Sequence, residues 1–156
     1  MTDLTLPDTM ADLLELALND LEACEADPHY HINMGSWLMK TPHACQVCLA
    51  GAVIARHVPP EDIEEFLEAG IRLSSPWDLP YGDSVAEKLC ALDYIRSGNF
   101  HAAFMGFYDT DSCDPRCGIV GKIRKKVGPI APYAFASEAF KDRLRETVTA
   151  FREAGL

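Results

Sequence analysis

The chain has 156 residues, of which 48% are hydrophobic and 24% are charged. This length and mixture are typical of one globular domain over residues 1–156, and they exclude wholesale disorder and collagen-like structure. The purest apolar run, residues 44–55, is 12 residues long. A membrane-spanning helix needs about 20, so the sequence predicts none. The first residues form no basic, apolar leader, and we therefore expect no secretory signal and a cytoplasmic location.

The net charge of −10 is concentrated in the first half of the chain. Residues 1–78 hold 14 Asp and Glu against 3 Lys and Arg, whereas residues 79–156 hold 10 against 11. An acidic half repels phosphate backbones and anionic lipids, so we expect no direct binding to nucleic acid or membranes. The one basic cluster is Lys122, Arg124, Lys125 and Lys126. We interpret it as a solvated face, with contact to an acidic partner as the alternative.

Two elements are predicted at the start of the chain. Apolar residues from Met10 to Cys24 recur at helical spacing, which predicts a helix over residues 9–25 that buries one stripe. Asp27-Pro28 ends it, because the residue before a proline avoids the helical region. Residues 29–34 alternate instead between larger apolar and polar side chains, which favours one short strand or extended segment.

Residues 44–57 are apolar almost all round, and this pattern predicts the central helix of the fold. Pro59-Pro60 then opens a predicted short helix that ends near residue 69. Residues 71–82 contain two further prolines and are interpreted as an ordered loop. Helical patterns follow over residues 84–97, 99–107, 119–127 and 137–154. The sequence thus predicts an all-α fold, a single compact domain of five to six helices around residues 44–57.

Six cysteines raise the question of metal binding. The sharpest signal is His43-x-Cys45-x-x-Cys48, because a Cys-x-x-Cys turn can direct two thiolates at one tetrahedral zinc ion and an imidazole can add a third ligand. Cys113 and Cys117 would complete such a structural zinc module. However, Cys48 opens the most apolar segment, where a thiol is a core residue. We therefore predict no metal and no cofactor, with zinc as the alternative.

The same cysteines suggest a second alternative, a thiol-dependent enzyme. Cys45 or Cys48 at a helix start, with His101 as base, has the residue types that acyl transfer requires. No local signature of a cysteine hydrolase surrounds either residue, and no nucleotide-binding, metalloprotease or serine-hydrolase motif is present. The prediction is therefore that the protein has no catalytic residue.

Three short runs carry a resemblance to a known group of proteins. They are Asp20-Leu-Glu-Ala-Cys-Glu-Ala-Asp-Pro28, Met34-Gly-Ser-Trp37 and Cys45-Gln-Val-Cys-Leu-Ala-Gly-Ala52. Together they resemble a segment, here residues 20–55, of small uncharacterised proteins of tailed bacteriophages and prophages. The resemblance implies a phage or prophage setting and the cytoplasm of a bacterial host, and it implies no catalytic residue.

These observations favour a small acidic interaction protein that binds or modulates a bacterial host protein. An acidic first half can present a phosphate-like surface to a host protein that itself binds nucleic acid. The predicted partner-binding residues are two tryptophans and the carboxylates that follow Pro59-Pro60. They are Trp37, Trp77, Glu61, Asp62, Glu64, Glu65 and Glu68.

Overall fold

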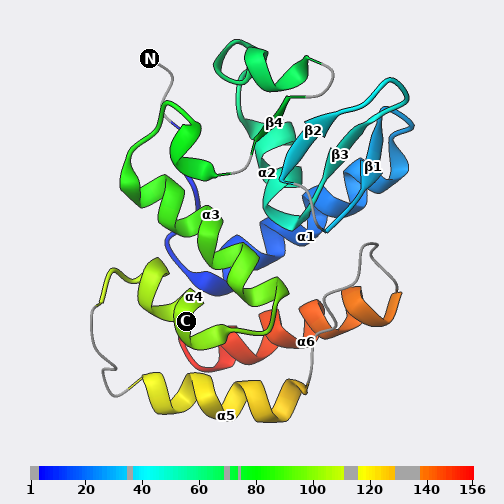
Figure 1. Ribbon diagram of the computed structural model, residues 1–156. Helices are drawn as coiled ribbons and strands as arrows, with labels where there is room; N and C mark the ends of the chain where they lie inside the picture. Colours follow the sequence, from blue (N-terminus) through cyan, green and yellow to red (C-terminus); the bar gives the residue numbers. More distant parts are fainter. Residues whose placement is uncertain (1–3, 35–36, 69–70, 74, 111–115, 129–137) are drawn as a thin grey trace.

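The computed structural model describes residues 4–34, 37–68, 71–73, 75–110, 116–128 and 138–156. Within them the chain forms α-helices, short 3-10 helices and one four-stranded sheet (Figure 1). The α-helices are α1 (Met10–Ala26), α2 (Leu49–His57), α3 (Asp83–Arg96), α4 (Phe100–Phe107), α5 (Cys117–Val127) and α6 (Glu138–Glu153). The 3-10 helices are η1 (Pro60–Asp62), η2 (Glu64–Leu67) and η3 (Pro76–Asp78). The strands are β1 (Tyr30–Ile32), β2 (Leu38–Lys40), β3 (Cys45–Val47) and β4 (Arg72–Leu73).

Helix α1 lies where its apolar spacing predicts it. Thr9 caps its first turn, because the Thr9 hydroxyl accepts a hydrogen bond of 3.2 Å from the backbone N–H of Asp12. Asp27, next to Pro28, has an extended backbone and ends the helix. The predicted stripe from Met10 to Cys24 is buried, and it contributes a large part of the hydrophobic core.

The prediction of an all-α fold is wrong, because a small mixed sheet lies beside α1 and α2 (Figure 1). Its strand order is β1-β3-β2-β4. Strands β1 and β3 are parallel, with Tyr30 opposite Cys45, whereas β2 runs antiparallel to both β3 and β4. The alternation over residues 29–34 did indicate β1. The other strands have two or three residues each, too few for a repeating pattern to appear in the sequence.

The predicted helix over residues 44–57 is therefore two elements. Residues 45–47 form β3, and α2 begins only at Leu49, with Cys48 as its N-cap. A short apolar run looks the same in a buried strand and in a buried helix, which explains the error. The prediction that this helix is central is consistent with the packing, because α2 contacts α1, α3 and the sheet and residues 49–54 are all buried.

Gly51 shows how tightly α2 is enclosed. A Cβ atom on Gly51 would lie 1.6 Å from the backbone carbonyl oxygen of Trp37. The close neighbour of Gly51 is thus the chain just before β2. Any side chain at this position would displace α2 from the sheet.

The segment after Pro59-Pro60 also departs from its prediction. In place of one helix to residue 69, the chain forms η1 and η2, which are separated by Ile63. Ile63 and Phe66 are buried beneath this segment, while the acidic residues around them point outward. The two tight turns therefore spread the carboxylates over a surface instead of aligning them along one helix face.

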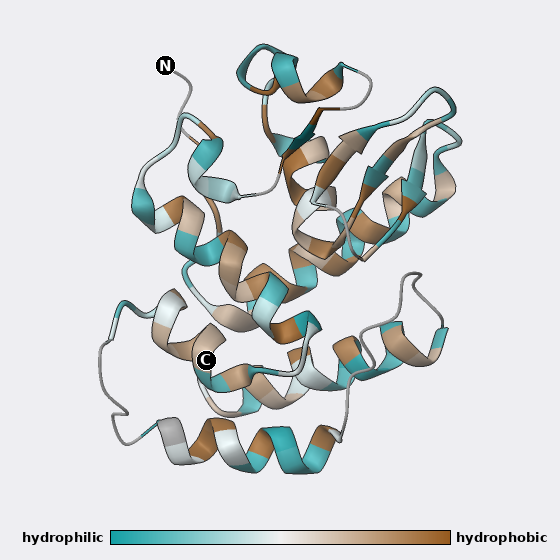
Figure 2. Cartoon of the chain, viewed as in Figure 1, coloured by the Kyte–Doolittle hydropathy of each residue, from teal (hydrophilic) through white to brown (hydrophobic). Residues whose placement is uncertain are grey.

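The remaining helices enclose the other side of α1. Helix α3 packs on α4, α4 packs on α5, and α6 packs on both α1 and α5. An edge-to-face contact between Phe100 and Phe151, with ring centroids 5.5 Å apart, joins α4 to α6. Figure 2 shows hydrophobic and hydrophilic residues alternating along α5 and α6, as expected for helices with one face on the core.

Candidate protein-docking surface

The structure separates the residues of the predicted thiol site. Cys45 lies buried in β3, and Cys48 lies buried at the N-cap of α2, where its sulfur accepts a hydrogen bond of 3.4 Å from the backbone N–H of Gly51. His101 is exposed on α4, a helix that packs on α3 and α5 rather than on β3. The three residues therefore do not form the nucleophile and base pair that the enzyme alternative requires.

The protonation state of these thiols also argues against a nucleophilic role. Burial raises the pKa of Cys45, and it raises the pKa of Cys48 to about 11 although the sulfur caps a helix N-terminus. Desolvation thus outweighs the helix dipole, which usually lowers a thiol pKa. Burial also raises the pKa values of Cys24 and Cys90 to about 11 each. At neutral pH these four cysteines are protonated thiols, a form that is a poor nucleophile.

The proposed zinc ligands are only partly within the described residues. His43 is exposed in the turn between β2 and β3, apart from the buried thiols of Cys45 and Cys48. Cys113 lies outside the described residues, and of Cys117 only the backbone, at the start of α5, is described. In the described part of the chain, no three His, Cys, Asp or Glu side chains form a group that could hold a metal ion. The absence of zinc stays a prediction, which elemental analysis of the purified protein would check.

Sequence reasoning missed one buried polar pair. Asp20 lies on α1 among apolar residues, is only 6% exposed and accepts a hydrogen bond of 2.8 Å from His57 Nε2 at the end of α2. Arg56 Nε lies 4.0 Å from the other carboxylate oxygen. Burial raises the pKa of Asp20, and the neighbouring His57 partly offsets that increase. The pair joins α1 to α2, and no simple sequence period relates its members.

The clearest candidate site is an exposed surface on η1, η2 and η3. We define the acidic surface as the exposed residues Glu61, Glu64, Glu65, Leu67, Glu68, Ile71, Trp77 and Asp78. Among the residues that the structure describes, none of these carboxylates takes part in an ion pair. Their like charges are therefore not offset by an ion pair with any residue that the structure describes.

Large apolar side chains are exposed within this acidic surface. Leu67, Ile71 and Trp77 are 37%, 40% and 52% exposed, and they are three of the five large hydrophobic residues exposed in the described chain. A solitary exposed apolar residue is ordinary, but three within eleven residues, surrounded by carboxylates, are typical of an interaction surface. Tryptophan in particular is common at the energetic centres of protein interfaces.

A hydrogen bond fixes the two ends of this surface to each other. The hydroxyl of Tyr81, just after η3, donates a hydrogen bond of 2.8 Å to Asp62 in η1. Burial and the bond to the Asp62 carboxylate together raise the pKa of Tyr81 to about 12. Asp62, predicted to bind a partner, is therefore engaged within the fold. Trp37, also predicted to bind a partner, is partly buried and packs against the core, so of the two tryptophans only Trp77 is freely presented.

A small pocket adjoins the acidic surface beside the sheet. Its volume is about 190 Å³, and Leu67 of the acidic surface forms part of its wall. Apolar residues such as Leu38, Val58 and Ile63 line it together with Cys45. A pocket of this size and composition can accept one apolar side chain of a bound protein.

Comparison with protein-family models, with curated proteins and with solved structures finds no match to this chain. No described helix combines the length and the apolar composition that crossing a bilayer requires. Conclusions about function therefore depend on the geometry and charge of the described surfaces.

Proposed function

We propose that this protein is a non-enzymatic interaction protein whose acidic surface docks a basic bacterial protein. The observation that carries the proposal is the combination of unpaired carboxylates with exposed Leu67, Ile71 and Trp77. The buried, protonated cysteines support this function over thiol catalysis, because they leave the predicted nucleophiles unreactive.

The two kinds of residue have different roles in docking. Exposed carboxylates contribute little binding energy one by one, because water and salt screen them, but together they attract a basic surface and orient it. Trp77 supplies the apolar contact area that keeps the partner bound. The pocket beside Leu67 adds a place for one apolar side chain of the partner.

The partner is proposed to be a host protein that binds nucleic acid. Such a protein has a basic surface shaped for phosphates, and the acidic surface offers carboxylates in their place. Direct binding of nucleic acid is disfavoured, because the chain has a net charge of −10 and its exposed carboxylates repel phosphates. A phage-encoded protein acting in the bacterial cytoplasm, as the sequence resemblance implies, fits this role.

Affinity capture with variants tests the proposal. Purified protein is immobilised and exposed to bacterial lysate at low and moderate salt, in parallel with Trp77→Ala. We expect a specific host protein that survives moderate salt with the wild type and is lost with Trp77→Ala. Tyr94→Ala is the matched control, because Tyr94 is 41% exposed on α3, outside the acidic surface. A partner retained equally by all three proteins, or no partner at moderate salt, would overturn the proposal.

A further inference from the structure

Helix α5 carries the opposite charge to the acidic surface. Residues 116–128 contain five Lys and Arg and no Asp or Glu. Two of these cations are occupied within the fold: Arg124 donates hydrogen bonds of 2.9 Å to the carbonyl oxygens of Gly98 and Gly128, and Arg116 stacks on the ring of Tyr108, with its guanidinium carbon 4.7 Å from the ring centroid.

The other three cations of α5 make no such contact with the residues that the structure describes. We define the basic face as Lys122, Lys125 and Lys126, which are exposed and form no ion pair with any residue that the structure describes. The cations of α6 differ, since Lys141, Arg145 and Arg152 are all paired with carboxylates of α1. The exposed side chain of Ile119 lies on the same helix as the basic face.

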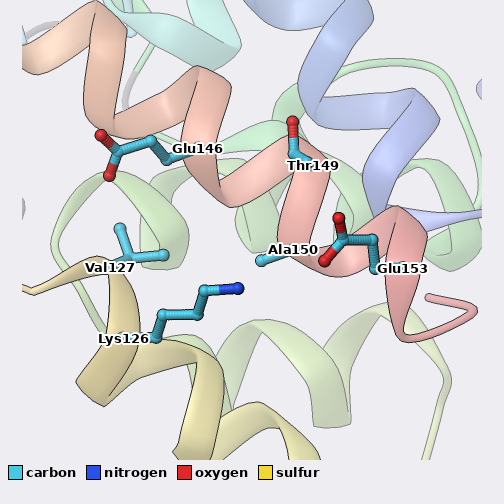
Figure 3. Close-up of a pocket in the computed structure, with 6 residues that line it drawn as sticks. All are labelled: Lys126, Val127, Glu146, Thr149, Ala150 and Glu153. Carbon is cyan, nitrogen blue, oxygen red and sulfur yellow. The ribbon is translucent and has the colours of Figure 1, made fainter.

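A groove separates the basic face from α6. Its deeper part has a volume of about 250 Å³, with Val127 and Ala150 among its lining residues. Figure 3 shows Lys126 reaching from α5 toward Ala150 and Glu153 of α6, with Glu146 further along the same helix. A second depression of about 230 Å³ shares Lys126, Ala150 and Glu153 and extends the groove toward Ile119.

We propose that the basic face and this groove bind the acidic surface of a second copy of the same chain. The inference rests in part on the proposed function, since it uses the same acidic surface. Lysines of the basic face would meet Glu61, Glu64 and Glu65 of the second copy. Trp77 would enter the groove, where its ring covers Val127 and faces the ammonium group of Lys126.

The composition of the groove favours this occupant over a nucleic acid. Glu146 and Glu153 of α6 form its far wall, and they would repel a phosphate backbone lying along the lysines. A protein surface that places carboxylates over α5 and an indole in the groove avoids this repulsion. It also pairs two sets of charges that have no partner within one described chain.

The two surfaces cannot meet within one molecule, because η1 and η2 lie at one end of the fold and α5 at the other (Figure 1). Contact between copies is therefore head to tail, and each added copy leaves one acidic surface and one basic face free. Such contacts produce rings or open chains instead of closed symmetric dimers. Self-association and host-partner docking then compete for the same acidic surface, so the partner would dissociate the chains.

The test measures the mass of the purified protein from micromolar to millimolar concentrations, at low and high salt, by sedimentation velocity. We expect the average mass of the wild type to rise beyond that of a dimer at low salt and to fall to that of a monomer at high salt. A head variant (Glu61→Gln, Glu64→Gln, Glu65→Gln, Trp77→Ala) and a tail variant (Lys122→Gln, Lys125→Gln, Lys126→Gln) should each remain monomeric. All seven side chains are exposed, so folding should be preserved.

Mixing the two variants gives the decisive result. The head variant keeps an intact basic face and the tail variant keeps an intact acidic surface, so an equimolar mixture should form one-to-one dimers and nothing larger. Tyr94→Ala, at an exposed residue of α3 outside both surfaces, is the control and should associate like the wild type.

A wild type that stays monomeric at low salt, or a tail variant that associates like the wild type, would overturn the inference. These failures are distinguishable from failure of the proposed function. A monomeric chain that still captures a host protein through Trp77 would leave that function standing, whereas head-to-tail association without any captured host protein would count against it.

Discussion

The acidic surface and the interface between α1 and α6 both contain carboxylates. The two regions differ in whether those carboxylates are paired with cations. Four carboxylates of α1 are paired with cations of α6, at distances such as 2.9 Å between Asp12 and Arg152 and 2.8 Å between Glu25 and Lys141. The fifth, Asp20, is paired with His57 of α2. The carboxylates of the acidic surface have no such partner in the described chain. Net charge alone does not distinguish these two groups, but the structure does, and only the second group is available to a binding partner.

The largest expected effect is on the reactivity of the buried cysteine thiols, because burial keeps them protonated. With a thiol pKa of about 11, only about one in ten thousand Cys48 side chains is ionised at pH 7. We therefore expect negligible labelling of Cys24 and Cys48 in the folded protein at pH 6 to 7, and rapid labelling after unfolding. Peptide mapping of the alkylated protein measures this. Fast labelling of either residue in the folded state would show that its thiol is activated.

The same pKa shift predicts how stability depends on pH. Cys48 has an ordinary pKa of 9.0 and a folded-state pKa of about 11. Because the folded-state value is the higher one, the stability that this buried thiol contributes is fully present below about pH 9 and is lost as the pH rises toward 11. Urea unfolding between pH 8 and pH 11 should show a decreasing free energy of unfolding, and Cys48→Ala should show a smaller decrease.

Replacing Gly51 should cause the largest loss of stability. Gly51→Ala would place a methyl group 1.6 Å from the Trp37 carbonyl oxygen, so α2 or the chain before β2 must move. We expect a loss of about 3 kcal/mol, measured by urea unfolding. Gly121→Ala is the matched control: a Cβ at Gly121 of α5 meets nothing within 4 Å. That variant should gain about 0.5–1 kcal/mol from helix propensity. Equal behaviour of the two variants would contradict the close approach at Gly51.

Removing a paired, buried carboxylate should lower the free energy of unfolding less than Gly51→Ala does. It should lower it more than the removal of an unpaired carboxylate. Asp20→Ala leaves His57 without its acceptor and opens space between α1 and α2, and we expect a loss of about 2 kcal/mol. Glu64→Ala, within the acidic surface, should change the free energy of unfolding by less than about 0.5 kcal/mol. If the two variants lose the same stability, the distinction between structural and available carboxylates is wrong.

A smaller difference in stability is expected between variants of two lysines. Lys141 is buried on α6, and its ammonium group lies 2.8 Å from Glu25 and 2.7 Å from Glu138. Lys141→Met keeps the packing of the side chain but removes both ion pairs, so we expect a loss of about 1 kcal/mol. Lys125→Met, on the basic face, should be close to neutral. Thermal unfolding at low salt measures both, and a neutral Lys141→Met would show that these ion pairs contribute nothing.

Helices α1, α3, α4, α5 and α6 could be predicted from the sequence because apolar residues recur along each of them at helical spacing. Helix α1 begins and ends close to its predicted boundaries, since Thr9 and Asp27-Pro28 act locally. Asn99 likewise caps α4, with its side-chain oxygen 3.2 Å from the backbone nitrogen of Ala102. Such signals depend on neighbours in the chain, which the sequence contains.

The sheet and the charge pairing could not be predicted, because both depend on contacts distant in the sequence. Strand β4 pairs with β2 across more than thirty residues, and Arg152 meets Asp12 across 140. The sequence did identify the carboxylates after Pro59-Pro60 and Trp77 as candidate docking residues. It gave no way to separate them from Trp37 and Asp62, whose contacts with the core and with Tyr81 are set by the tertiary fold.

The smallest expected change in stability gives the sharpest test of the difference between the paired carboxylates of α1 and those of the acidic surface. Replacing Glu61, Glu64, Glu65 and Glu68 together by Gln removes four like charges and no ion pair that the structure describes, so the free energy of unfolding should stay within about 0.5 kcal/mol of the wild type or rise slightly at low salt. The matched variant replaces Asp12, Glu15, Glu22 and Glu25 of α1, again by Asn or Gln, and removes the same number of charges. It should unfold at a lower temperature, because it breaks the pairs with α6. Host-protein capture should show the reverse order, lost in the first variant and kept in the second. A first variant that unfolds as readily as the second would mean that the acidic surface is part of the structural framework and not free for a partner.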